Sequence, residues 1–270
     1  MQSENRTIKK SQRLKTGYRS CVFIISLFLF IFAGCFPDNP VVEDNSDFSA
    51  IKNVLFIGHS YTFWNNMPFM FQQMTVDSGE DTVILATMYT DGGASLQRFW
   101  NSDQYAILRE INQGHYDYVF MQGIILEGED RGKYAHYFDE EIDKTGAQTM
   151  LYLPWASEGY EEYQETINEG YYAVAEEIGA IVAPVGIGWH RSIADNPEID
   201  LYDTDRNHPS RAGSYFAACI FYSVLYNKSP EGLPTRITYS GSVLADIPAD
   251  HAAALQRTAW ETVQEMNNKK

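Results

Sequence analysis

Short apolar runs alternate with amphipathic segments along most of the chain. The first run, residues 53–58, is rich in Val, Leu, Phe and Ile and ends at Gly58. Runs of this length without a polar face are typical of strands that are buried on both faces of a sheet. We expect further strands over residues 82–88, 116–122, 149–155 and 180–185.

The segments between these runs have helical spacing. In residues 95–111, for example, Leu96, Phe99 and Ile111 fall near one face of a helix. Alternating strands and helices predict a parallel sheet, and five strands covered on both faces predict a flavodoxin-like three-layer α/β/α domain. Functional side chains should then lie on loops after the carboxyl ends of the strands. The other expected helices are residues 67–76, 133–145, 160–178 and 210–226.

The first 35 residues have the pattern of an export signal. Residues 1–20 hold six Lys and Arg side chains against one Glu, and a short apolar run follows up to Phe32. The run is too short to span a bilayer comfortably, so we interpret residues 1–34 as a signal peptide; the alternative is an N-terminal membrane anchor. The tetrapeptide Phe32-Ala33-Gly34-Cys35 resembles the lipobox of bacterial lipoproteins. This resemblance implies a lipid on Cys35 that holds the protein at the cell envelope.

The remaining chain divides into a tether and one domain. Residues 35–50 are rich in Pro, Asn and Asp and are expected to be a flexible tether. Residues 51–270 are long enough to form a single domain with a substantial core.

Composition narrows the possible functions. The net charge of −16 over 270 residues argues against a nucleic-acid partner, because phosphate binding needs clustered Lys and Arg. Three cysteines are too few for a disulfide framework or a Cys-rich zinc module. Gly186 and Gly188 follow a predicted strand, but Arg191 stands where a dinucleotide fingerprint needs its third glycine. We therefore expect no cofactor and no metal.

Two segments carry side chains suited to nucleophilic catalysis. Ser60 follows the first predicted strand, where a tight turn can expose its hydroxyl, although glycine and serine are also ordinary turn residues. Asp205 precedes His208 by three residues on a predicted loop, so its carboxylate can orient the imidazole. The alternatives are a capped acidic loop, a metal site of Asp203, Asp205 and His208, or a base supplied by His190.

Together, Gly-x-Ser at residues 58–60 and Asp-x-x-His-Pro at residues 205–209 resemble the SGNH (GDSL-like) hydrolase superfamily. The resemblance spans residues 52–227, with two further segments in the expected order. Gly93 matches the family glycine whose N–H joins the oxyanion hole, and Gly92 is its alternative. Gln122, at the end of the third predicted strand, stands where the family usually has Asn.

The resemblance implies the SGNH hydrolase fold and a serine esterase mechanism. Ser60 would be the nucleophile, His208 the base and Asp205 the group that orients it. The N–H groups of Ser60 and Gly93 and the side-chain amide of Gln122 would form the oxyanion hole. The sequence departs from the GDSL pattern at residue 59, where His replaces Asp.

The expected partner is an ester-bearing substrate, with acetyl esters of glycans first. Two alternatives stay open: a non-catalytic glycan-binding lipoprotein, and an acyltransferase that uses the same residues. Aromatic side chains that could stack on a sugar, or belong to the core, are Tyr61, Phe63, Trp64, Trp100, Trp155 and Trp189.

Overall fold

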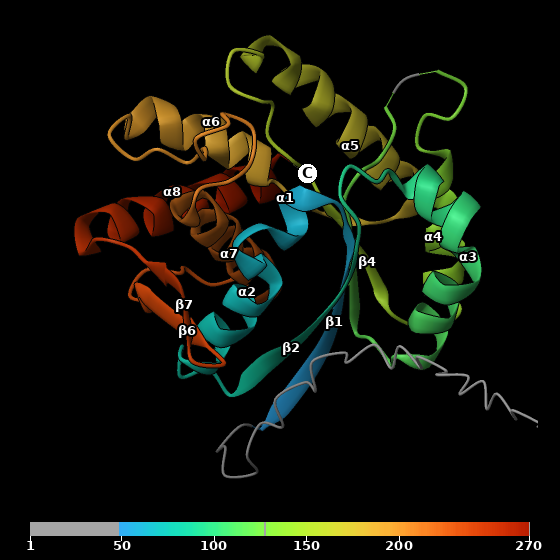
Figure 1. Cartoon of the computed structure of the whole chain (residues 1–270), viewed down its shortest axis with the longest axis horizontal. Helices are drawn as coiled ribbons and strands as arrows, with labels where there is room; N and C mark the ends of the chain where they lie inside the picture. Colours follow the sequence, from blue (N-terminus) through green and yellow to red (C-terminus); the bar gives the residue numbers. More distant parts are fainter. Residues whose placement is uncertain (1–48, 127, 270) are drawn as a thin grey trace, which may run out of the picture. The chain divides into compact units, whose positions relative to one another are not determined.

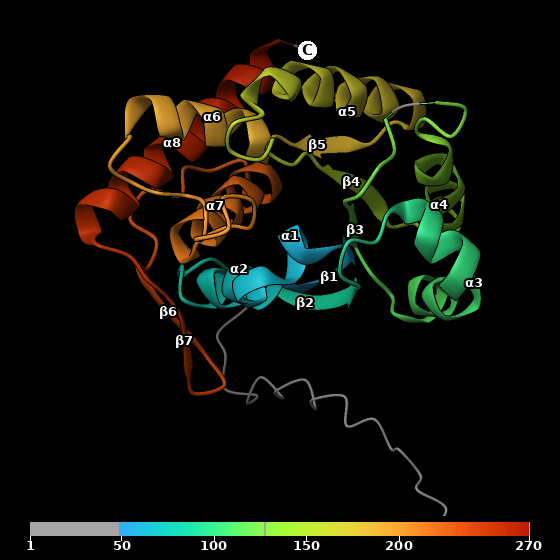
Figure 2. The same cartoon turned by 45° about the horizontal axis from the view of Figure 1, so that its top comes forward.

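A five-stranded sheet forms the centre of the folded unit. The structure, a computed structural model, describes residues 49–126 and 128–269, so the predicted signal peptide, Cys35 and nearly all of the tether lie outside the described residues. The strand order is β2-β1-β3-β4-β5 and every neighbouring pair is parallel (Figure 2). The strands are β1 (Ala50–Gly58), β2 (Thr82–Thr90), β3 (Tyr118–Met121), β4 (Gln148–Tyr152) and β5 (Ile181–Ala183). Each predicted strand is confirmed.

Helices cover both faces of this sheet (Figure 1). Alternate side chains of β1 enter two separate cores: Phe56 packs toward α2 and α7, whereas Leu55 and Ile57 pack toward α3 and α4. The first layer consists of α2 (Met67–Val76), α6 (Val185–Asp195), α7 (Arg211–Tyr226) and α8 (Ala249–Asn268). The second layer consists of α3 (Leu96–Gln113), α4 (Lys133–Asp143) and α5 (Gln164–Ile178). The predicted three-layer α/β/α fold is confirmed.

Helix α6 was not among the helices expected from the sequence. Its glycines serve close packing: a Cβ on Gly186 would lie 2.0 Å from the carbonyl oxygen of Pro154. A helix without a side chain at this position can approach the end of β4 more closely than one with alanine.

A small antiparallel hairpin was also missed. Strands β6 (Arg236–Tyr239) and β7 (Ser242–Asp246) pair across a two-residue turn in which Ser240 and Gly241 both have positive φ. The Ser-Gly dipeptide between short alternating runs is a hairpin signal. In the part of the chain that the structure describes, no helix is both long and apolar enough to cross a membrane.

Candidate active site

The turn after β1 places Ser60 at the carboxyl end of the sheet. Gly58 ends the strand, His59 is the N-cap residue of the short helix α1 (Ser60–Phe63), and Ser60 is the first residue of that helix. There is no room for a side chain at residue 58, because a Cβ would lie 2.4 Å from Thr62 Oγ1 and 2.8 Å from Gln122 Oε1. The glycine therefore lets the chain turn sharply against β3 and expose the serine hydroxyl.

The loop before α7 brings a histidine to the same edge. Its ends are joined by a bridge between Tyr202 and Pro209, and the Ser210 hydroxyl accepts a hydrogen bond from the Gly213 N–H to cap α7. Asp205 folds back on the loop, where its carboxylate accepts hydrogen bonds from the backbone N–H groups of Asn207 and His208. This local geometry fixes the carboxylate three residues before the imidazole.

Ser60, His208 and Asp205 form one chain of hydrogen bonds. Ser60 Oγ lies 2.7 Å from His208 Nε2, and His208 Nδ1 lies 2.5 Å from Asp205 Oδ2. Hydrogen bonds from the His208 side chain and backbone lower the pKa of Asp205 to about 2. The carboxylate is therefore charged at neutral pH and holds the proton of the imidazole on Nδ1, which leaves Nε2 to accept the serine proton.

Two backbone N–H groups near Ser60 are available to a ligand. Neither the N–H of Ser60 nor that of Gly93 has a hydrogen-bond partner among residues 49–126 and 128–269. Gly93 lies in an exposed turn with φ of 64°. That turn is held near the strand ends, because the Asp91 N–H donates to Gly58 O at 3.3 Å and the Leu96 N–H donates to Gly123 O at 3.0 Å.

The side chain of Gln122 is buried and mostly engaged. Its carbonyl oxygen accepts hydrogen bonds from the His59 N–H and the Thr62 hydroxyl, both at 3.0 Å, and its amide nitrogen lies 2.5 Å from His59 Nε2. Burial, followed by the charge of His208, lowers the pKa of His59 to about 4. A neutral His59 with its proton on Nδ1 can accept one amide hydrogen of Gln122 at Nε2, which leaves the other amide hydrogen for a ligand. In this tautomer Nδ1 does not accept the Tyr61 N–H, from which it lies 3.4 Å away.

Tyr61, Trp64 and Ser157 contact the loop of His208; the sequence indicated the two aromatic residues only as candidates for sugar stacking or for the core, and it did not indicate Ser157. The indole of Trp64 stacks on His208, with ring centroids 4.2 Å apart and an interplanar angle of 16°. The Trp64 Nε1–H donates to Asp203 Oδ2 at 3.1 Å. The Asn207 side-chain oxygen accepts hydrogen bonds from the hydroxyls of Tyr61 and Ser157.

The metal alternative is not supported by these contacts. Asp203 is engaged by Trp64 and by the Thr204 N–H, whereas Asp205 is engaged by its own loop and His208. Among residues 49–126 and 128–269, no group of three His, Cys, Asp or Glu side chains is arranged to hold a metal ion.

Trp155 and Trp189 belong to the core, which is one of the two alternatives that the sequence left open for them. Trp189 is fully buried and stacks on the buried Trp155 at a centroid distance of 3.9 Å, so neither indole is available to a sugar. The Ser60 hydroxyl is paired with His208, which favours His208 over His190, on α6, as the base. Trp155 contacts two residues beside the site: its Nε1–H donates to Asn207 O, and its ring stacks on Tyr61.

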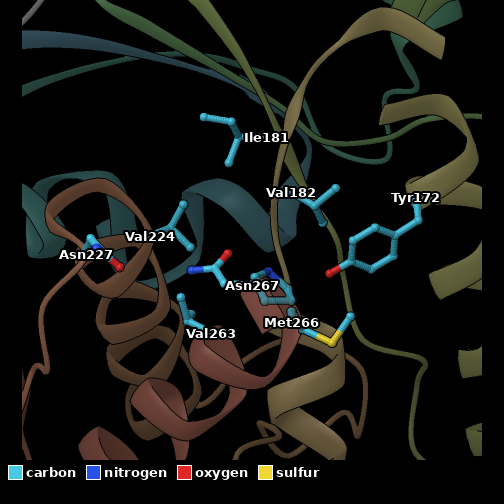
Figure 3. Close-up of a pocket in the computed structure, with 9 residues that line it drawn as sticks. Tyr172, Ile181, Val182, Val224, Asn227, Val263, Met266 and Asn267 are labelled. Carbon is cyan, nitrogen blue, oxygen red and sulfur yellow. The ribbon is translucent and has the colours of Figure 1, made fainter. Parts of the chain in front are cut away.

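A cavity of about 300 Å³ lies elsewhere, between β5, α7 and the end of α8 (Figure 3). Val182, Val263, Tyr172 and Met266 are among the residues that line it (Figure 3). It contains none of the residues around Ser60, so the candidate active site is the surface at the carboxyl end of β1.

Solved structures of other proteins have a similar fold. A protein assigned to the SGNH hydrolases from Slackia heliotrinireducens is 23% identical, with a TM-score of 0.55 over 65% of this chain and 99% of that one. A DUF4886 family protein from Bacteroides uniformis is 18% identical, with a TM-score of 0.62 over 79% of this chain and 95% of that one. An acetyl xylan esterase is 16% identical, with a TM-score of 0.50 over 64% and 99%.

These likenesses establish the class of fold. The chain has the fold of the SGNH hydrolases, which is shared by esterases, as the sequence motifs predicted. No protein-family model matches the chain, and no curated protein sequence matches it either.

Proposed function

We propose that this protein is a serine ester hydrolase. The observation that carries the proposal is the hydrogen-bonded chain from Ser60 through His208 to Asp205 at the carboxyl end of β1. As Ser60 Oγ bonds to the acyl carbon, its proton passes to His208 Nε2 and the carbonyl electron pair moves onto oxygen. The tetrahedral intermediate then expels the alcohol, which takes the proton from His208. Water releases the acyl group from Ser60 by the same route.

The oxyanion is held by donors around the nucleophile. We assign the backbone N–H groups of Ser60 and Gly93, both without a partner in the described chain, and the remaining amide hydrogen of Gln122. Each donor should be worth about 10²–10³ in rate. Because Gln122 is fixed by His59 and Thr62, the donor would be oriented before the substrate arrives.

The test is hydrolysis of p-nitrophenyl acetate by the purified full-length chain and by Ser60→Ala. We expect Ser60→Ala to lose all activity above background, because no covalent acyl-enzyme can form. Ser102→Ala, which changes an exposed serine on α3, is the matched control and should keep the wild-type rate. Equal activity in wild type and Ser60→Ala, or none in either across short and long acyl esters, would favour a binding protein. Product analysis with acceptor alcohols separates hydrolysis from acyl transfer.

We further propose that the substrates are acetyl esters on glycans. Two exposed tyrosines support this proposal: Tyr160 and Tyr163 are 59% and 56% exposed, with ring centroids 6.2 Å apart. Their segment is tied to the loop of His208, since the Glu158 N–H donates to Arg206 O. Exposed aromatic rings offer flat apolar surfaces with a polar edge, which suit sugar rings. Tyr163→Ala should weaken activity on an acetylated polysaccharide and leave p-nitrophenyl acetate hydrolysis unchanged.

We also propose that the protein is exported and anchored by a lipid on Cys35. The support is the sequence from Phe32 to Cys35 after a basic and then an apolar segment. Mass spectrometry of the protein from membranes should find a lipid-modified Cys35 at the new N-terminus. In Cys35→Ser, an unmodified and uncleaved chain is expected; a lipidated Cys35→Ser chain would contradict the assignment.

A further inference from the structure

The segment that follows the nucleophile also encloses the histidine. Trp64 comes four residues after Ser60, at the end of α1 and the start of the one-turn helix η1 (Trp64–Asn66). Its indole lies nearly parallel to the His208 ring, with centroids 4.2 Å apart. This is direct face-to-face contact between an electron-rich ring and an imidazole.

Trp64 is itself held in place from two sides. Its Nε1–H donates to Asp203 Oδ2 at 3.1 Å, and the backbone N–H of Asp203 donates to the carbonyl oxygen of His208 at 2.7 Å. The indole, Asp203 and His208 therefore form a closed set of contacts. Hydrogen bonds from the Thr204 N–H and from the Trp64 indole keep the pKa of Asp203 below its usual range, so its carboxylate stays an acceptor.

The backbone on the other side of Trp64 is also tied to the loop of His208. Asn65 and Asn66 both have left-handed backbone, with φ of 55° and 53°, a conformation that Asn tolerates better than most residues. The Asn65 side-chain amide donates to Pro209 O at 2.9 Å and to Ser214 Oγ at 3.0 Å. The indole is thus fixed relative to the residues on both sides of His208.

We propose that Trp64 is the positioning residue for His208: its indole holds the imidazole between Ser60 and Asp205 and stabilises the imidazolium formed when Ser60 gives up its proton. This role rests on the proposed esterase function. A cation over the face of an indole is favoured over one above any other side-chain ring. Because His208 is charged in the transition state and neutral before it, the stacking lowers the barrier more than it aids substrate binding.

The other groups that face His208 do not replace this contact. Asp205, on the same loop, and Ser60 occupy the two ring nitrogens. The Tyr61 ring meets His208 edge-on at a centroid distance of 5.9 Å. His59 has a pKa of about 4 and is neutral at working pH, so it adds no charge beside the imidazolium.

The kinetic test compares Trp64→Leu and Trp64→Phe in the full-length chain with p-nitrophenyl acetate. We expect kcat of Trp64→Leu to fall roughly ten- to thirty-fold with KM within about two-fold, and Trp64→Phe to recover most of the loss. Trp260→Leu, at a half-buried tryptophan on α8, is the matched control. Wild-type kcat in Trp64→Leu would overturn the proposal. If Trp64→Leu does not fold, a fluorescence difference between wild type and His208→Gln that persists without Trp64 overturns the proposal.

The second test does not depend on ester hydrolysis. An imidazole stacked on an indole changes the emission of that indole, so wild type and His208→Gln should differ in tryptophan fluorescence at one fixed pH. The difference should be missing between Trp64→Phe and the double variant Trp64→Phe/His208→Gln; an equal difference in both pairs would contradict the stacking. If Ser60→Ala were as active as wild type, the proposed function would fail while this comparison still reported the contact between Trp64 and His208.

Discussion

The two ends of the proposed proton path are built in different ways. Ser60 follows the buried end of β1, and its turn is fixed by Gly58, where no side chain fits, and by the buried Gln122. His208 lies on a surface loop in which the Asp205 side chain is 46% exposed and Arg206 has φ of +60°. Core packing thus fixes the nucleophile, whereas stacking and local hydrogen bonds fix the base. Substitutions near Ser60 should therefore change the free energy of unfolding, and substitutions near His208 should change the rate of ester hydrolysis.

The largest effect on stability is expected from His59, at the buried end. Its pKa of about 4 lies below the ordinary value of 6.5, so the unfolded chain takes up a proton first as the pH falls. Burial of a neutral His59 therefore does not reduce the free energy of unfolding above about pH 6.5, but it reduces this free energy progressively as the pH falls toward 4. When the pH falls from 7 to 4.5, the free energy of unfolding should therefore decrease by about 2–3 kcal/mol less in His59→Asn than in wild type.

Urea unfolding at both pH values measures this difference. Asn is a favourable residue at the N-cap position of α1, so the substitution removes no helix cap. His115→Asn is the control, because His115 is exposed and has φ of 50°, which Asn adopts readily. Equal pH dependence in wild type and His59→Asn would mean that the imidazole is not held neutral by burial.

A smaller effect on stability is expected at Gly58. Its new Cβ in Gly58→Ala would lie within 3 Å of both Thr62 and Gln122, which are buried and cannot move aside freely. We expect a loss of about 1–3 kcal/mol in the free energy of unfolding, measured by urea titration. Gly92→Ala, at an exposed glycine with nothing within 4 Å of a Cβ, should change it little. A fully stable Gly58→Ala would show that the turn adapts and that packing does not fix it.

The difference between the two ends also explains what the sequence could predict. The buried runs determine the sheet, and Ser60, Asp205 and His208 each follow from short local patterns, so the fold was predictable. Trp64 was recognised only as an aromatic residue near a motif, because its partners His208 and Asp203 lie more than a hundred residues away along the chain. Contacts between distant segments leave no local periodicity.

Two omissions have the same physical origin. Gly186 and Gly188 were considered only as part of a dinucleotide fingerprint, yet they lie in a helix that packs closely on Pro154 and Phe216. A glycine in the sequence shows that the position has no side chain. It does not show whether the backbone turns there or whether another segment packs closely against it. For the same reason the sequence did not indicate that His59 contacts Gln122, since the strand pairing that joins them is tertiary.

The smallest effect is expected at the exposed end, in the ion pair between Glu158 and Arg206. Both side chains are partly exposed, and Arg206 also pairs with Asp200 at 2.8 Å, so Glu158→Gln should lower the free energy of unfolding by less than about 1 kcal/mol. The wild type should lose most of that difference in about 1 M NaCl, where exposed charges are screened. Glu261→Gln, in an exposed contact with Arg191 on the far helices, is the matched control for unfolding in urea. A loss in Glu158→Gln as large as that of Gly58→Ala would show that the loop of His208 is part of the cooperative core, and the contrast between the two ends would not hold.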